Sequence, residues 1–254
     1  MLIVALLFAF SVSAQEKLFL VFEFMKVDNS QETAYQETEA FWEKIHEERV
    51  KNGDIIGWDL WSLQPGGEEQ GFQYMTVILY DDPVKMRSNS GDFEKALHQA
   101  YPDLSEAELN TKFDETAASR DLAVRIYLER IDYTEGEFEM PIGTISLIDM
   151  MKVELGNYET YEKAESEVFK PMHQQQVDLG EKASWGLLRF MSPIGSDTYA
   201  SHITVNMFID FNQVYMNRSQ GPELSASQEQ AIKDGIASRD LKYVYTGRLI
   251  RKVR

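Results

Sequence analysis

The sequence predicts an α+β fold in which two similar βαββαβ units pair their antiparallel sheets into one intramolecular barrel. The first observation is a repeated stretch: residues 44–53 (KIHEERVKNG) have a second version at 171–180 (PMHQQQVDLG), with His, Val and Gly at the same positions in each. The second is the tetrapeptide Ser-Arg-Asp-Leu, which occurs at 119–122 and again at 238–241. Each unit leaves one face of its sheet without helices, and a second sheet of the same kind covers that face.

The first 14 residues have the pattern of a signal peptide. An apolar run at 2–10 is followed by Ser-Val-Ser-Ala, so cleavage is expected after Ala14. The run is too short to span a bilayer. No Lys or Arg precedes it, which leaves a buried first strand as the alternative. A signal peptide implies a periplasmic or secreted protein.

Composition limits the partners and the chemistry. The chain of 254 residues is 43% hydrophobic, which is enough for packed cores, and its formal net charge is −17. Such an acidic surface repels phosphate backbones and anionic membranes, so we expect neither a nucleic-acid partner nor membrane insertion. The chain contains no Cys, which excludes disulfides and the lipid anchor of a bacterial lipoprotein.

The first unit, a ferredoxin-like repeat, is expected at 15–133. Strands are predicted from runs of Phe, Val and Leu, helices from apolar residues at spacings of three and four, and turns from Gly and Pro. The expected elements are a strand at 17–27, a helix at 31–52, strands at 55–63 and 72–80, a helical insertion at 83–102, a helix opened by a capping box at Ser105, and a strand at 123–132.

The second ferredoxin-like repeat is expected at 142–254, after an acidic linker at 134–141. Its expected elements are a strand at 142–153, a helix at 157–179, strands at 183–191 and 199–209, a helix opened by a capping box at Ser225, and a strand at 242–252. Ser119 lies 73 residues after His46, whereas Ser238 lies 65 residues after His173. The first repeat is therefore longer, mainly through its helical insertion.

This plan resembles the dimeric α/β-barrel superfamily, in which two ferredoxin-like units, separate or fused, pair their sheets. The resemblance covers residues 17–254, and segments 42–53 and 169–180 also resemble a group of secreted bacterial proteins of this type without an assigned activity. Superfamily members include quinol-type and antibiotic-biosynthesis monooxygenases, haem-degrading enzymes, chlorite dismutases and stress-response barrels. The resemblance implies a fold and several possible activities, because one fold hosts many functions.

His46 and His173 are the catalytic candidates, since they are the two histidines that match between the repeats. A helical His can act as a general base or ligate haem iron. The structural alternative is packing at the edge of the apolar helix face. No HxxxH, HExxH, GxSxG, GxGxxG or P-loop pattern is present, so the sequence predicts no metal site, nucleophile elbow or nucleotide loop.

Further candidates lie at matching positions of the repeats. Trp58 and Trp185 either line the barrel mouth or belong to the core. Arg120 and Arg239 either clamp an anionic ligand or complement a helix dipole. Strand alternation could point three polar side chains into the barrel, namely Tyr74, His202 and Asn206.

The leading hypothesis is a small-molecule-binding barrel that holds a largely apolar molecule between its sheets, with no cofactor. One alternative is an enzyme, either a cofactor-free monooxygenase or a haem-using protein with His46 or His173 as base or axial ligand. Another is a purely structural or interaction role. The internal pseudo-dimer predicts a monomer, and a higher oligomer stays open.

Overall fold

The computed structural model describes residues 17–64, 70–88, 91–216 and 224–254. The expected signal peptide at 1–14 lies outside the described residues, as does the segment Pro-Gly-Gly at 65–67, whose composition predicts a turn between two strands.

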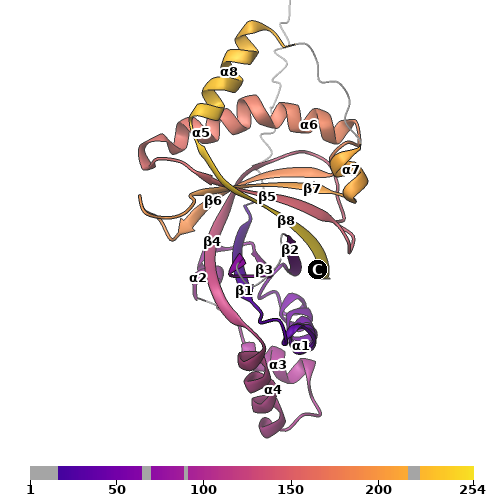
Figure 1. Ribbon diagram of the computed structural model, residues 1–254. Coiled ribbons are helices and arrows are strands. Elements are labelled where there is room, and N and C mark those ends of the chain that lie inside the picture. Colours follow the sequence, from indigo (N-terminus) through magenta and orange to yellow (C-terminus); the bar gives the residue numbers. More distant parts are fainter. Residues whose placement is uncertain (1–16, 65–69, 89–90, 217–223) are drawn as a thin grey trace, which may run out of the picture.

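Eight antiparallel strands close a barrel in the order β1-β3-β2-β8-β5-β7-β6-β4 (Figure 1). Each half has the strand order of a ferredoxin-like unit, and the halves join where β2 pairs with β8 and β4 pairs with β6. The α+β barrel predicted from the sequence is therefore confirmed. The strands are β1 (Phe19–Lys26), β2 (Gly57–Gln64), β3 (Tyr74–Tyr80), β4 (Asp121–Tyr133), β5 (Ile145–Lys152), β6 (Ser184–Ser192), β7 (His202–Phe208) and β8 (Asp240–Val253).

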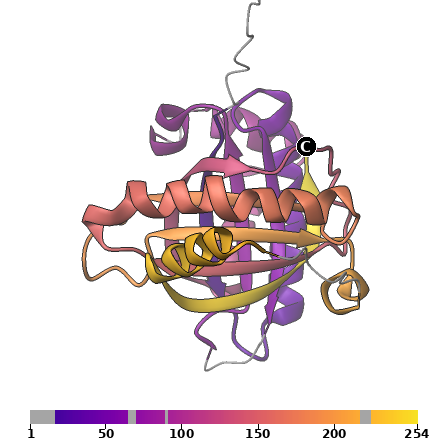
Figure 2. The same cartoon turned by 90° about the horizontal axis from the view of Figure 1, so that it is seen from above.

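The helices lie outside the barrel: in Figure 1, α1, α3 and α4 lie below it, α5, α6 and α8 lie above it, and α2 lies beside the first-half strands. Seen from above, α5 and α6 lie across the strands of the second half (Figure 2). The helices are α1 (Glu32–Lys51), α2 (Pro83–Ser88), α3 (Phe93–Ala100), α4 (Glu106–Ser119), α5 (Tyr158–Ala164), α6 (Lys170–Asp178), α7 (Phe211–Tyr215) and α8 (Ala226–Ala237), with a 3₁₀ turn at Leu155–Asn157 and a π-helix at Glu165–Phe169. None of these described helices is both long and apolar enough to cross a membrane.

Local signals in the sequence position several of these elements. Both predicted capping boxes are confirmed, at Ser105 for α4 and at Ser225 for α8. Gly53 and Gly180 follow the first long helix of each half with φ of 75° and 72°, as expected for residues that end a helix. The predicted helix at 157–179 is instead three consecutive segments, because a π-helix separates α5 from α6.

The barrel interior is packed with apolar side chains. Alternation places one set of each strand inward, and these inward residues form a single core that includes Leu20, Phe22, Trp61, Leu128, Ile148, Leu188 and Ile203. The neighbouring residues on each strand face the helices. Tyr74, His202 and Asn206 belong to this outward set, so the prediction that they point between the sheets is wrong. Apolar residues at alternate positions of β3 and β7 occupy the interior instead.

Candidate functional site

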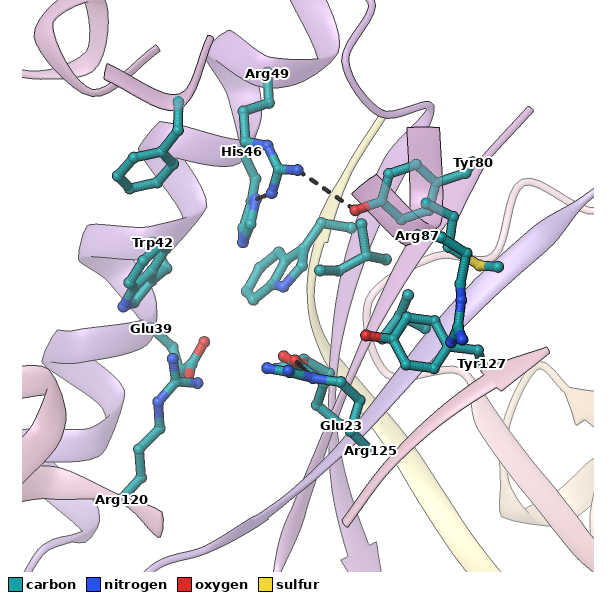
Figure 3. A pocket seen from close by; sticks show the side chains of 16 residues that line it. Glu23, Glu39, Trp42, His46, Arg49, Tyr80, Arg87, Arg120, Arg125 and Tyr127 are labelled. Atoms are coloured by element: carbon teal, nitrogen blue, oxygen red, sulfur yellow. Dashed lines mark hydrogen bonds and ion pairs between the residues drawn. The ribbon is translucent and has the colours of Figure 1, made fainter. Parts of the chain in front are cut away.

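A cavity lies between α1 and the outer face of the first-half strands, outside the barrel (Figure 3). Its volume is about 500 Å³. We call it the α1 pocket. Its walls come from α1, β1, β2, β3, β4 and the insertion, and they include Glu23, Glu39, Trp42, His46, Arg49, Trp58, Thr76, Ile78, Tyr80, Arg87, Phe93, Arg120, Arg125 and Tyr127.

Helix periodicity supplies one wall. Glu39, Trp42, His46 and Arg49 follow one another at spacings of three and four, which places all four side chains on the helix face that meets the sheet. The outward residues of the strands form the opposite wall. The pocket therefore uses the side of the sheet that faces away from the barrel interior.

His46 is held in one orientation. Its ring, 5% exposed, stacks on Trp58 with centroids 5.1 Å apart, and Arg49 Nη1 lies 3.4 Å from His46 Nδ1. Burial and the adjacent Arg49 and Arg120 lower the pKa of His46 well below its usual range. Because a guanidinium can only donate, Nδ1 accepts and the ring proton sits on Nε2.

Two carboxylates in the α1 pocket, the buried Glu39 and the half-buried Glu23, are paired with arginines. Arg120 donates to Glu39, which is 1% exposed, and Arg125 Nε donates to Glu23 Oε1 at 2.6 Å. Burial raises the pKa of the Glu39 carboxyl, although Arg120 opposes this effect. At the rim, the guanidinium of the exposed Arg87 lies 4.4 Å from the centre of the Tyr127 ring.

The second half repeats the His–Trp pair with a different cation. His173 stacks on Trp185, with centroids 5.1 Å apart, and Lys182 Nζ lies 2.7 Å from His173 Nδ1. Burial and Lys182 lower the pKa of His173 to about 3, and burial lowers the pKa of Lys182 to about 8. Both histidines thus face the sheet, as the sequence predicts, and both are neutral near pH 7.

A chain of polar side chains crosses the second half at the position of the first-half pocket. Lys182 Nζ donates to Asn206 Oδ1 at 2.7 Å, and Asn206 Nδ2 donates to Asp149 Oδ2 at 2.9 Å. Asp149 and Thr204 match Glu23 and Thr76, which line the α1 pocket. In both halves the threonine donates directly to the carboxylate, Thr76 Oγ1 to Glu23 Oε2 at 3.3 Å and Thr204 Oγ1 to Asp149 Oδ2 at 2.8 Å. In the second half Asn206 also connects Asp149 to Lys182.

The other candidate site residues predicted from the sequence do not lie together, because some belong to the first half and some to the second. Arg120 lines the α1 pocket, whereas Arg239 pairs with Glu165 at 3.6 Å. His202 Nε2 lies 3.0 Å from Glu162 Oε1, and Tyr74 packs on Tyr35 with ring centroids 4.5 Å apart. Of the sequence candidates, the structure thus brings His46, Trp58 and Arg120 together in one cavity.

Sequence reasoning did not single out Glu23, Glu39, Arg87 and Arg125. One signal could have found Glu39: a Tyr followed four residues later by Glu occurs in both halves, as Tyr35 with Glu39 and Tyr161 with Glu165. Arg87 lies on α2, and the equivalent helix of the second half, α7, has Tyr215 at that position, so comparison of the repeats gives no signal for Arg87.

The donor atoms do not fit axial ligation of haem. Iron needs an imidazole nitrogen with a free lone pair. In both His46 and His173 the Nδ1 lone pair faces a cation and Nε2 carries the proton, so neither ring offers one. Across the described residues, no group of three or more His, Cys, Asp or Glu side chains could hold a metal ion.

Comparison with known proteins supports the fold. No family model matches the chain, and no curated protein matches its sequence. Among solved structures, a candidate monooxygenase from Fusobacterium nucleatum subsp. nucleatum is 10% identical over 95% of each chain, with a TM-score of 0.57. An anthrone oxidase-like protein is 10% identical over 94% of this chain and 93% of that one (TM-score 0.55), and a haem-binding protein from Thermus thermophilus is 8% identical over 93% and 92% (TM-score 0.50). The chain therefore has the fold of dimeric α/β-barrel proteins.

Proposed function

We propose that this chain binds a small planar aromatic molecule with a negative charge in the α1 pocket. The observation that carries the proposal is the combination of side chains there: the rings of Trp42, Trp58 and Phe93 lie in the same cavity as several guanidinium groups. Aromatic walls favour a flat ring system, and arginine forms charge-assisted hydrogen bonds to carboxylate or phenolate oxygen.

The charge of the pocket differs from that of the whole chain. Four arginines and two glutamates line the pocket, and His46 is neutral, whereas the formal net charge of the chain is −17. An anion is costly to bury unless it is paired. Guanidinium groups that line a partly closed cavity supply that pairing, so the pocket favours an anion despite the acidic surface.

This site differs in place from the one expected from the sequence. The sequence favours a ligand between the two sheets, where apolar side chains fill the middle of the barrel and leave a recess at one end. The α1 pocket lies on the other face of the first sheet. The segment at 83–102 of the first half contributes Met86, Arg87 and Phe93 to its lining.

Binding of 1-naphthoate, with 1-naphthylmethanol as its neutral counterpart, tests the proposal by isothermal titration calorimetry. The wild type should bind one naphthoate per chain and prefer it to the alcohol. Arg87→Gln should weaken naphthoate binding at least about tenfold, because one charge-assisted hydrogen bond is lost, and should leave the alcohol unaffected.

Lys85→Gln is the matched control. Lys85 lies on the same helix as Arg87, pairs with Asp81 at 3.2 Å and does not line the pocket. Equal loss of naphthoate affinity in both variants, or equal binding of the acid and the alcohol by the wild type, would contradict the proposal.

A second candidate is an oxygenase-type enzyme without a cofactor. The names of the proteins with a similar fold suggest it, and one feature of the pocket supports it: the buried Glu39 carboxylate lies beside Arg120. Such a carboxylate can accept a proton from an acidic C–H or phenol, and the arginine can stabilise the anion formed. His46 is less suited to this role because its Nδ1 faces Arg49 and its Nε2 already carries a proton.

Oxygen uptake with anthrone as the probe tests the enzyme candidate. Glu39→Gln should lower the rate at least about 100-fold, since a general base contributes that much or more. Glu165→Gln, the equivalent change in the second half, should retain the rate. The enzyme candidate fails if the wild type takes up no oxygen, or if Glu39→Gln is as active as the wild type.

A further inference from the structure

A second recess lies inside one end of the barrel, next to the connection between the halves. Its volume is about 360 Å³, and its walls are largely apolar, with Leu20, Trp61, Met75, Ile148 and Leu188 among them. These residues point inward, whereas the α1 pocket uses the outward residues of the first sheet. The barrel wall therefore separates the two cavities, with Val77 facing the recess and Ile78 facing the α1 pocket.

Small inward residues create this recess. Gly247 on β8 pairs with Ser146 on β5, and Met207 on β7 pairs with both Ser146 and Ser184. Ser146, Ser184 and Gly186 all line the recess, and their small size leaves space in it. The side chains of Trp61 and Ile148 fill the space beside Gly247. A barrel of eight strands has just enough interior volume for its side chains, so a layer of small residues leaves space.

Among the described residues, three that line the recess have a buried polar atom without a hydrogen-bond partner, namely Asp59, Ser146 and Trp185. Asp59 is ion-paired with Arg254, and Trp185 stacks on His173 on the outer face of the sheet, so the Ser146 hydroxyl is the one left to a neutral ligand. Ser146 is 1% exposed, and its hydroxyl has no hydrogen-bond partner among the described residues. Its inward position on β5, two residues before Ile148, directs it at the recess. A buried hydroxyl without a partner destabilises a fold, so its presence in an otherwise apolar layer calls for a ligand atom.

The connection between the halves closes the open end. Met140 packs on the barrel core at 7% exposure with a positive φ of 50°, a conformation that a non-glycine residue rarely adopts. Phe138 also lines the recess. At the rim, Arg254 pairs with Asp59 at 2.9 Å, so the charges there already neutralise each other.

From this geometry we propose a second binding site, in the barrel end, for a neutral and mainly apolar molecule with a single hydroxyl or carbonyl oxygen. The apolar part occupies the space left by the small residues, and the oxygen bonds to Ser146. The site does not depend on the α1 pocket, because its residues lie on the opposite side of the sheet.

Calorimetric titration with 1-octanol, in the full chain, tests the site with two variants. Wild type should bind one octanol per chain. Ser146→Ala should weaken binding about five- to tenfold, since one neutral hydrogen bond is lost, and Ser146→Leu should abolish it by filling the recess. Naphthoate binding serves as the control: it should be the same in all three proteins and unaffected by saturating octanol.

The thermal midpoint without ligand gives a second measurement. Ser146→Ala should raise it, because the variant removes a buried hydroxyl that lacks a partner. A lower midpoint would show that the hydroxyl already makes an internal bond and would overturn the proposal. Absence of saturable octanol binding by the wild type, or equal binding by Ser146→Leu, would also overturn it. Loss of naphthoate binding alone would count against the α1 pocket and leave this site standing.

Discussion

At the residue scale, the two halves hold their histidines in the same way. Each ring stacks on a Trp at 5.1 Å, and each Nδ1 faces a cation, Arg49 in the first half and Lys182 in the second. The repeated spacing of His and Trp predicts that the two residues are related. It does not predict the cation, because Arg49 and Lys182 come from different elements and are not equivalent in the repeat.

The buried neutral His46 makes stability depend on pH. Its pKa is lowered in the folded state, whereas an unfolded His titrates near about 6.5. As pH falls below that value, the unfolded chain takes up a proton that the folded chain does not, so the free energy of unfolding decreases. The contribution of this residue is therefore fully present above about pH 6.5 and is lost below it.

The prediction compares the wild type with His46→Gln in urea unfolding between pH 7.5 and pH 5. The wild type should lose up to about 1.4 kcal/mol per pH unit more than the variant below pH 6.5, because the variant has no imidazole at this position to titrate. Parallel curves for the two proteins would mean that folding does not lower the pKa of His46.

At the element scale, a single extra residue distinguishes the long helices. Tyr161 and Glu165 lie 126 residues after Tyr35 and Glu39, whereas His173 lies 127 residues after His46. In a regular α-helix one extra residue turns the following side chains by about 100°. The π-helix at Glu165–Phe169 takes up this residue, so that His173 still reaches Trp185.

Deleting single exposed residues tests this account. Removal of Glu167 should leave a helix with the spacing of α1 and should change the free energy of unfolding by less than about 1 kcal/mol. Removal of Lys44 from the regular α1 should turn His46 away from Trp58 and cost at least about 3 kcal/mol. Similar losses in urea unfolding for the two deletions would contradict this role of the π-helix.

The insertion shows what element-level sequence patterns can and cannot predict. A helical segment at 83–102 is expected, and α2 and α3 are found there. Its contribution to the pocket could not be inferred, since Arg87 reaches Tyr127 only through the packing of α2 beside the sheet. The sequence feature that comes nearest to indicating this contribution is the greater length of the first repeat.

At the scale of the whole molecule, the sequence predicts the barrel because the repeated pattern of apolar residues fixes which faces are buried. The location of the cavities does not follow from that pattern. It depends on side-chain volumes across neighbouring strands, such as the small residues around Ser146 and the Lys182–Asn206 chain in the second half. The two halves, although similar in fold, thus have different cavities. We therefore expect one anion-binding pocket per chain.

The most direct test is a crystal structure of the chain with 4-bromo-1-naphthoate, in which anomalous scattering locates the bromine. The account predicts one bromine peak per chain, between α1 and the outer face of β1 and β3, with the carboxylate within hydrogen-bond distance of Arg87, Arg120 or Arg125. A peak in the second half beside Lys182, or peaks of equal height in both halves, would contradict it.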